Sequence, residues 1–381
     1  MLLTKREITE YTEACLKQID KGIARLGSTI YTQDIAIDGV YVPHFNGSWL
    51  SGFWTGLLML SYEASSEPKY RSMVEKQIDS FYDRIKVRFD VRHHDMGFVY
   101  SPSCVAAYKL WGDEKAREAA VMAADCLCSR YLDNGGYIKA WGEMSDPVEN
   151  RIIIDCLMNL PLLFWAYEET GNERYREVAE NHLKLSARLL IRADGTTHHT
   201  YMMDLREGNP ICPKTDQGYN DNSVWSRGQA WAIYGLTLAY SYTKDESLLK
   251  SIKMVTDKFI ELLPEDNVPA WDMIFTDIYT LKDTSASAIA SCGILEFNKH
   301  SVGDAQSEMW NEKAHDMLRA LGEHHLIKND SNPDSSALLR HGTQWFTMDG
   351  RGAVNVGLIY GDYFFMEALV RLLKPDWNRY W

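Results

Sequence analysis

Two aspartates of this 381-residue sequence lie in surroundings that suit acid–base chemistry. Asp155 follows three isoleucines and precedes Cys156, in the segment "NRIIIDCLMNLP". Apolar neighbours keep water away from a carboxyl group, which raises its pKa and keeps it protonated. Asp95 lies instead in the polar segment "RHHDMGF", directly after His94. A pair of carboxyl groups in unlike surroundings is typical of a general acid and an ionised partner.

Each aspartate also has a purely structural interpretation, and the sequence leaves both open. Asp155 could cap a helix or bind backbone amides, and Asp95 could form a turn through its own side chain. Pro161 disfavours helical geometry at Leu160, so a regular helix is expected to begin near Pro161 rather than at Asp155.

An arginine lies among tryptophans in the segment "NDNSVWSRGQAW". Arg227 and Trp231 are four residues apart, so they share one face of the expected helix. Together they could flank a ring that carries a carboxylate, with the charge on the guanidinium and the ring face on the indole. The structural alternative is an arginine stacked on Trp231 by a cation–π contact.

The histidines do not have the spacing of a metal site. They include two adjacent pairs, His93 with His94 and His198 with His199. Adjacent side chains on a helix point apart and cannot both reach one ion. A glycine-rich phosphate loop and a serine or cysteine nucleophile elbow are also absent from the sequence. We therefore expect neither a metal nor an organic cofactor.

The composition restricts the partners of the protein. The formal net charge is −13, which argues against binding to nucleic acid, although a local basic pocket could still hold a small anion. The 12 tryptophans need partners for their N–H groups, so some are expected to line a cleft. The seven cysteines fit neither a disulfide framework nor a zinc site, which favours the cytoplasm. The charged start of the sequence and the shortness of its most apolar window predict neither a signal peptide nor a membrane span.

Helical periodicity runs through the whole chain, and we interpret residues 1–381 as one domain. Apolar helices are expected at 52–65, 101–112, 159–171, 227–243, 284–297 and 361–373. Amphipathic partners are expected at 114–132, 173–190 and 246–263, among others. This repeat predicts an all-α fold, the (α/α)6 barrel, with the apolar helices as its inner wall. An open superhelix is the alternative, but its repeats are shorter and more regular.

Several segments resemble the unsaturated glucuronyl hydrolases, glycoside hydrolase family 88, from about residue 40 to the C-terminus. They are "GSWLSGFWTGLLMLSYE", "RHHDMGF", "SVWSRGQAWAIYGL", "KDTSASAIASCGILE" and "LIYGDYFFMEALVRLL". The resemblance implies an (α/α)6 barrel that removes a 4,5-unsaturated uronic acid from the non-reducing end of oligosaccharides made by polysaccharide lyases. Di- or oligosaccharides of glycosaminoglycans are the implied substrates.

The resemblance also implies roles for particular residues. Asp155 matches the general acid/base, and Asp95 matches the second essential carboxylate. The substrate-contacting positions are matched by Trp49, His94, Trp141, His199, Gln217, Trp225, Arg227 and Trp231, with Thr215 in the loop beside them. In the segment 340–362, relatives often have a proline and an acidic residue where this chain has "MDGRGAVN". That loop is implied to face the sugar beyond the cleaved bond.

Other functions remain compatible with the sequence. A sugar epimerase on the same toroid would use paired histidines as its acid and base. A non-catalytic helical scaffold would have no need of a cleft lined by tryptophan and arginine. Within the same class, an unsaturated rhamnogalacturonyl or galacturonyl hydrolase would act on pectin fragments.

Overall fold

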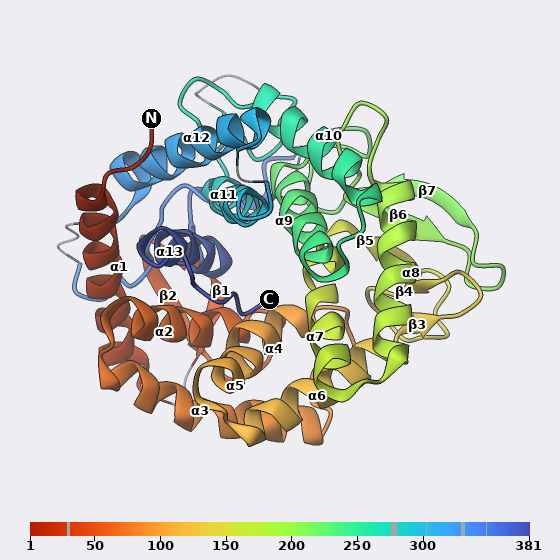
Figure 1. The fold of residues 1–381 in the computed structure, drawn as a ribbon, viewed down its shortest axis with the longest axis horizontal. Coiled ribbons are helices and arrows are strands. Elements are labelled where there is room, and N and C mark those ends of the chain that lie inside the picture. The colour runs from red at the N-terminus through yellow and green to blue at the C-terminus, as the bar shows by residue number, and fades with distance from the viewer. Residues whose placement is uncertain (29–30, 276–279, 302, 329–331, 348) are drawn as a thin grey trace.

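The computed structural model describes residues 1–28, 31–275, 280–301, 303–328, 332–347 and 349–381. It is mostly helical, and its helices form two concentric layers when viewed down the shortest axis (Figure 1). No helix in these ranges is long and apolar enough to cross a lipid bilayer.

The inner layer consists of helices that are buried on nearly all sides. For example, every residue from Thr284 to Phe297 is buried. A helix that is apolar all round needs neighbours on all sides, which explains this central position. The inner helices are α2 (Ser51–Ser65), α4 (Met96–Tyr100), α5 (Ala106–Trp111), α7 (Leu160–Thr170), α9 (Ser226–Thr243), α11 (Thr284–Asn298) and α13 (Ile359–Leu373). The short α5 is the exception among them, since only Ala106 and Ala107 are buried.

The outer layer consists of amphipathic helices that bury one stripe and expose the other. Helix α1 begins with a capping box, in which Thr4 Oγ1 accepts from the backbone N–H of Glu7 and the Glu7 carboxylate accepts from that of Thr4. The outer helices are α1 (Lys5–Leu26), α3 (Pro68–Lys86), α6 (Glu114–Cys128), α8 (Glu173–Leu190), α10 (Ser247–Glu261) and α12 (Ala305–Ala320). The predicted division into apolar and amphipathic helices is thus confirmed.

The inner helices contact one another in a cycle. Helix α2 packs on α4, α4 on α7, α7 on α9, α9 on α11, α11 on α13, and α13 again on α2. Each section of this cycle is covered by an outer helix, as when α8 packs on α7, α10 on α9 and α12 on α11. The segments that lead into the inner helices therefore come close together although they are far apart in the sequence.

The second inner section begins earlier than the sequence predicts. A helix was expected over 101–112, but α4 already begins at Met96, directly after Asp95. A π-helical turn over Ser101–Val105, with Pro102 inside it, then leads into α5. Proline cannot donate a backbone hydrogen bond, which accounts for the irregular turn. The early start places Asp95 at the N-terminus of a buried helix.

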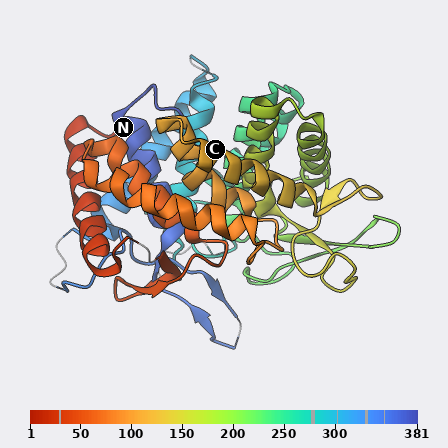
Figure 2. The ribbon, with the colours of Figure 1, turned by 90° about the horizontal axis from the view of Figure 1, so that it is seen from below.

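Short strands, which the helical periodicity did not predict, lie on one side of the helical layers (Figure 2). Antiparallel pairing joins β1 (Tyr31–Ile37) to β2 (Val40–His44) and β10 (Gly357–Leu358), and β3 (Tyr131–Leu132) to β4 (Tyr137–Ile138). It also joins β6 (Thr200–Met203) to β5 (Arg151–Ile153) and β7 (Pro210–Lys214), and β8 (Trp345–Phe346) to β9 (Gly352–Ala353). These hairpins hold the loops that carry most of the candidate site residues.

Candidate active site

Asp155 lies where strand β5 turns toward helix α7. The backbone N–H of Ile154 donates to the carbonyl of His199, 3.0 Å away, which ties this turn to the residues before β6. A 3₁₀ turn over Ile154–Met158 follows, and α7 begins at Leu160, as Pro161 predicts. Asp155 is only partly exposed, and its Oδ1 is buried with no hydrogen-bond partner among the described residues. It therefore does not act as a simple helix cap.

The surroundings of Asp155 favour its protonated form. The pKa of this carboxyl group is raised to about 8, because burial and, to a lesser extent, the negative charge of Asp95 raise it and together outweigh the Arg227 cation, which lowers it. The fully buried Ile154, Cys156 and Leu157 supply the apolar environment. Asp155 is thus a neutral acid at pH 7, and its pKa is shifted in the direction that its apolar neighbours predict.

Asp95 is the opposite case, a buried carboxylate that stays ionised. Burial alone would raise its pKa, but His94, His93 and Asn159 lower it, and the net result is a pKa below the ordinary value. Its carboxylate oxygens lie 3.2 Å from His93 Nδ1 and 3.3 Å from His94 Nε2. Burial lowers the pKa of His94 to about 4, so that ring is neutral at pH 7.

Asn159 connects the two aspartates and was not singled out from the sequence. Its Oδ1 accepts from the backbone N–H of Phe98 at 2.8 Å, and its Nδ2 donates to the carbonyl of Asp155 at 3.3 Å. A Cβ on Gly97 would lie 2.5 Å from the Asn159 Cα, so only glycine allows α4 to approach this closely. Its position four residues after Asp155, within an apolar segment, is the signal that could have identified it.

Arg227 lies in the first turn of helix α9 and is buried, with 1% of its surface exposed. Its guanidinium pairs with Asp283 and donates to the carbonyls of Thr343 at 3.0 Å and Gln344 at 2.6 Å. It lies 4.6 Å from the ring centroid of Trp225 and 5.0 Å from that of Tyr360. A planar guanidinium satisfies such a site by hydrogen bonding at its edge and stacking at its faces.

The structural alternative for Arg227, a cation–π contact with Trp231, is therefore wrong. The sequence spacing placed both on one helix face, but the guanidinium stacks on Trp225 and on Tyr360, which comes from α13. Trp231 is buried and packs on Phe98, at a centroid distance of 5.1 Å, and on Phe364, at 5.4 Å. The helical count missed this because the partners of the guanidinium come from other segments.

A second group of candidate residues surrounds His199. Its ring centroid lies 4.3 Å from that of Trp225, and its Nδ1 lies 3.2 Å from Thr215 Oγ1 and 3.1 Å from the backbone N–H of Asp216. Burial lowers the pKa of His199 to about 3, so the ring is neutral. Since Nδ1 accepts a hydrogen bond, Nε2 carries the proton and can donate to a ligand. Gln217 follows in the same loop and donates to the Gln344 carbonyl at 3.1 Å.

The remaining candidates are two partly exposed indoles. Trp49 stacks on Tyr360, with ring centroids 5.6 Å apart and planes 24° apart, and also packs on Phe98. Trp141 lies under the guanidinium of Arg151, 5.3 Å from its ring centroid. Partly exposed aromatic faces next to buried acids are suited to a sugar ring.

Known proteins are similar to this chain over most of its length. A sequence model of Glycosyl Hydrolase Family 88 matches residues 28–343. The chain belongs to this family. It is 43% identical to an unsaturated chondroitin disaccharide hydrolase of Streptococcus pneumoniae, over 100% of this chain and 95% of that protein.

Solved structures agree with this assignment to family 88. The crystal structure of unsaturated glucuronyl hydrolase from Streptococcus agalactiae matches with a TM-score of 0.95 and 44% identity, over 100% of this chain and 95% of that chain. An aspartate-to-asparagine variant of the same enzyme, complexed with dGlcA-GalNAc6S, matches with a TM-score of 0.87 and 41% identity, over the same shares. This family 88 protein is therefore a glycosidase.

The family 88 site contains a positioning network that the sequence did not reveal. Asp283 caps helix α11 through the N–H of Ser285 and also pairs with Arg227. The Gln344 carbonyl accepts from both Arg227 and Gln217. The side-chain amide of Gln344 donates to Asp34. Segments from four parts of the chain thus fix one guanidinium. Asp283 lies inside a segment that carries the family resemblance, which is the signal that could have identified it.

Replacing Arg227 by lysine in this family 88 enzyme should lower kcat/KM roughly tenfold or more, chiefly through KM. Lysine keeps the charge beside Asp283 but loses both the stacking and the fork that reaches Thr343 and Gln344. Steady-state kinetics on an unsaturated disaccharide measure the effect. Arg371→Lys is the control. Arg371 is also a buried arginine, but it lies about 16 Å farther along α13 than Tyr360, the ring that stacks on Arg227. Wild-type kinetics for Arg227→Ala would show that the pocket lies elsewhere.

Dialysis against EDTA should leave the turnover of this enzyme unchanged. His199 directs Nδ1 toward Thr215, whereas His198 lies against the Tyr201 ring at a centroid distance of 6.0 Å, so the pair does not converge. Within the described ranges, no three His, Cys, Asp or Glu side chains are grouped as metal ligands. Elemental analysis of the active protein checks the stoichiometry. A loss of activity on chelation that zinc restores would contradict the expectation.

Proposed function

We propose that this family 88 glycosidase removes the 4,5-unsaturated uronic acid from the non-reducing end of lyase-generated oligosaccharides, glycosaminoglycan fragments above all. The observation that carries the proposal is the opposite protonation of two neighbouring carboxyl groups. Burial raises the pKa of Asp155 to about 8, whereas the histidine contacts and Asn159 outweigh burial at Asp95 and keep its pKa low. One group can donate a proton while the other stays charged.

The proposed reaction begins at the double bond rather than at the glycosidic carbon. An unsaturated uronate is a vinyl ether, because its C4=C5 bond adjoins the ring oxygen. Asp155 donates its proton to C4, and the ring oxygen stabilises the cationic character that develops at C5. Ordinary glycosidases instead place a carboxylate or an activated water at C1. A neutral Asp155 can supply this proton at pH 7 without prior activation.

Water then completes the hydration. It adds to C5, and its proton returns to the Asp155 carboxylate, which restores the acid for the next turnover. The product is a hemiketal at C5, whose ring opens to a ketone. The former C1 linkage is then a hemiacetal, and it releases the next sugar without direct attack at C1. Asp95 remains ionised throughout, binds sugar hydroxyl groups and, by its charge, keeps the pKa of Asp155 high.

Neutral donors and ring faces are proposed to bind the uronate together with Arg227. Because Asp283 partly neutralises Arg227, the substrate carboxylate also needs the N–H of His199 and the amide of Gln217. The partly exposed Trp49 and Trp141 are proposed to cover the sugar faces. His94, Thr215, Trp225 and Trp231 complete the proposed contacts, directly or by holding their neighbours in place.

The names of the relatives support the substrate class. The Streptococcus pneumoniae relative is a chondroitin disaccharide hydrolase, and the Streptococcus agalactiae variant was solved with dGlcA-GalNAc6S. We propose disaccharides of this kind, which begin with an unsaturated uronate, as substrates. The described part of the loop 340–357 supplies the Thr343 and Gln344 carbonyls beside Arg227, so this part borders the proposed uronate pocket, and the place of the loop near the leaving sugar stays a proposal. Met348, within this loop, lies outside the described residues.

We further propose that residues 1–381 form one (α/α)6 barrel. The support is the cycle of inner helices and the outer helix that covers each section. A cytoplasmic location is likewise proposed, because all seven cysteines are free and most are buried.

A lyase-generated chondroitin disaccharide tests the proposed function. Hydration destroys the enol-ether absorbance band, whereas an epimerase would leave it intact. In heavy water, one deuterium should appear at C4 of the opened product. Label at another carbon, or an unchanged band with full consumption of substrate, would rule the mechanism out. A parallel unsaturated galacturonyl substrate distinguishes the pectin-directed alternative.

A further inference from the structure

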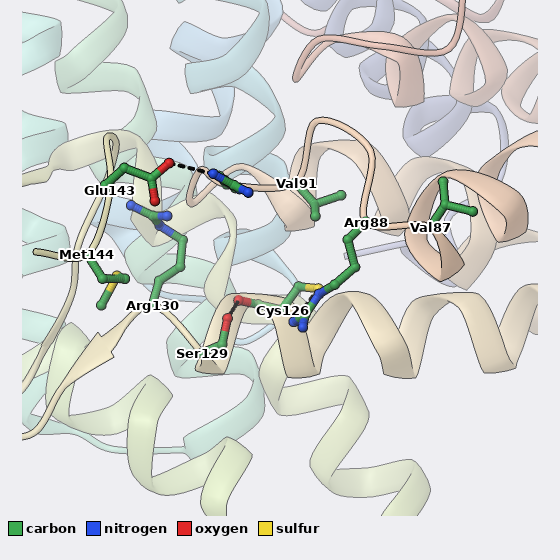
Figure 3. A pocket seen from close by; sticks show the side chains of 9 residues that line it. Val87, Arg88, Val91, Cys126, Ser129, Arg130, Glu143 and Met144 are labelled. Atoms are coloured by element: carbon green, nitrogen blue, oxygen red, sulfur yellow. Dashed lines mark hydrogen bonds and ion pairs between the residues drawn. The ribbon is translucent and has the colours of Figure 1, made fainter.

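A cavity of about 380 Å³ lies beside the loop that leads to Asp95. Ligand pockets of proteins typically enclose roughly 300–1,000 Å³, so this cavity is large enough for a small molecule. Figure 3 shows that its walls come from residues 87–92, from the end of α6 and from the segment 143–144. Neither candidate catalytic aspartate lines it, and the cavity therefore differs from the site described above.

The lining is positively charged, in contrast to the chain as a whole. Arg88, Arg92 and Arg130 face the cavity with Glu143 as the one acidic residue of its lining, whereas the whole chain has a net charge of −13. A local cationic site on an acidic protein attracts small anions and repels larger polyanions. The charge pattern therefore points to a small anionic group.

Arg130 is held rigidly at one wall of the cavity. Its Nε donates to the carbonyl of Lys139 at 2.7 Å and its Nη2 to that of Gly142 at 3.1 Å. These hydrogen-bond acceptors are neutral, the carboxylates of Asp95 and Glu143 act on the charge only through space, and its Nη1 makes no hydrogen bond to any described residue. Burial lowers its pKa, but an arginine remains protonated at neutral pH. An anion in the cavity would relieve the cost of burying this charge.

The other two arginines are free to turn toward a ligand. Within the described ranges, the one side-chain hydrogen bond of Arg88 goes to the Sγ of Cys126 at 3.6 Å, and sulfur is a weak acceptor. Arg92 pairs with Glu143 at 2.5 Å, but the side chains are 77% and 67% exposed. Such surface pairs contribute little and exchange readily. A ligand in this cavity can thus replace the contacts of Arg88 and Arg92 without breaking a buried salt bridge.

Apolar side chains complete the cavity. Val91 and Met144 line it together with the arginines. An inorganic ion gains nothing from such contacts, whereas the C–H face of a sugar ring does. We propose that this cavity binds a sulfate or carboxylate group, and that the group is carried by a sugar. The site is separate from the uronate site, and its occupation does not depend on the hydration chemistry proposed above.

Calorimetry with probes that lack an unsaturated uronate tests this site. The probes are N-acetylgalactosamine 6-sulfate, N-acetylgalactosamine and inorganic sulfate, at constant ionic strength because arginine–anion contacts are salt-sensitive. The sulfated sugar should bind best and the neutral sugar not at all. Equal binding of inorganic sulfate and the sulfated sugar would show a free-anion site and overturn the sugar part of the proposal.

The double variant Arg88→Ala/Arg92→Ala should weaken binding of the sulfated sugar tenfold or more. Both residues are exposed, and alanine at position 88 adds no strain because arginine already adopts φ 55° there. The double variant Arg6→Ala/Arg176→Ala removes the same charge from exposed helix pairs and should bind like the wild type. Hydrolysis of an unsulfated disaccharide should stay unchanged in both. Undiminished binding in the first variant would overturn the site.

Discussion

Asp155→Asn should lower turnover by roughly 10²–10⁴-fold while substrate binding largely survives. Asparagine keeps the shape of the side chain but has no proton to donate to C4 and cannot receive one from water. Binding survives because the indoles, Arg227 and His199 supply it. Pre-steady-state kinetics and calorimetry on an unsaturated disaccharide separate the two effects. Asp113→Asn makes the same chemical change at the cap of α6 and should leave turnover intact.

The pH dependence of the wild type follows from the same carboxyl group. Because burial raises the pKa of Asp155 from its ordinary 3.8 to about 8, the donor is present at pH 7 and is lost above about pH 8. The kcat/KM profile should therefore fall on its alkaline side near pH 8. A bound uronate adds a negative charge nearby, so the corresponding fall in kcat should lie at still higher pH.

Stability gives an independent measure of this pKa. Between about pH 4 and pH 8, folded Asp155 holds a proton that the unfolded chain has lost, so the free energy of unfolding decreases as pH rises across this window. The asparagine of the Asp155→Asn variant does not ionise, so this variant should gain thermal stability relative to the wild type as pH rises from 5 to 8. A near-wild-type rate for Asp155→Asn, or a stability difference that does not change with pH, would contradict the assignment of Asp155 as the proton donor.

The helical architecture could be predicted from sequence because it depends on local patterns. The apolar segments at 227–243 and 284–297 correspond to α9 and α11 within one residue at either end. Pro161 correctly marked the start of α7. The strands could not be found in this way, since several are two residues long and exist only through pairing with distant partners, as β10 pairs with β1.

The sequence predicts the surroundings of a single candidate residue but not the contacts between distant ones. The isoleucines before Asp155 predict a desolvated carboxyl group, because residues next to Asp155 in the sequence also lie next to it in space. The partners of Arg227 lie 56 to 117 positions away, at Asp283, Thr343 and Gln344, so no local spacing reveals them. The four-residue rule that paired Arg227 with Trp231 describes helix geometry correctly, but it does not say which contacts tertiary packing will select.

Asp95→Asn should lower turnover roughly 10²-fold or more and also change the pH profile. The charge of Asp95 raises the pKa of Asp155, so its removal should lower that pKa and move the alkaline fall of kcat/KM to lower pH. A residue that only held the fold would reduce the rate without this shift.

The control for this shift lies in the same loop. Asp90→Asn also removes one negative charge, but Asp90 is exposed, and its pair with Arg84 at 3.7 Å is screened by solvent. The amide oxygen of the new asparagine can still accept from the backbone N–H of Ser48, so the loop is retained. We expect the profile of Asp90→Asn to overlay that of the wild type. If both variants shift the alkaline limb equally, or if Asp95→Asn leaves it in place, Asp95 does not set the pKa of the proton donor.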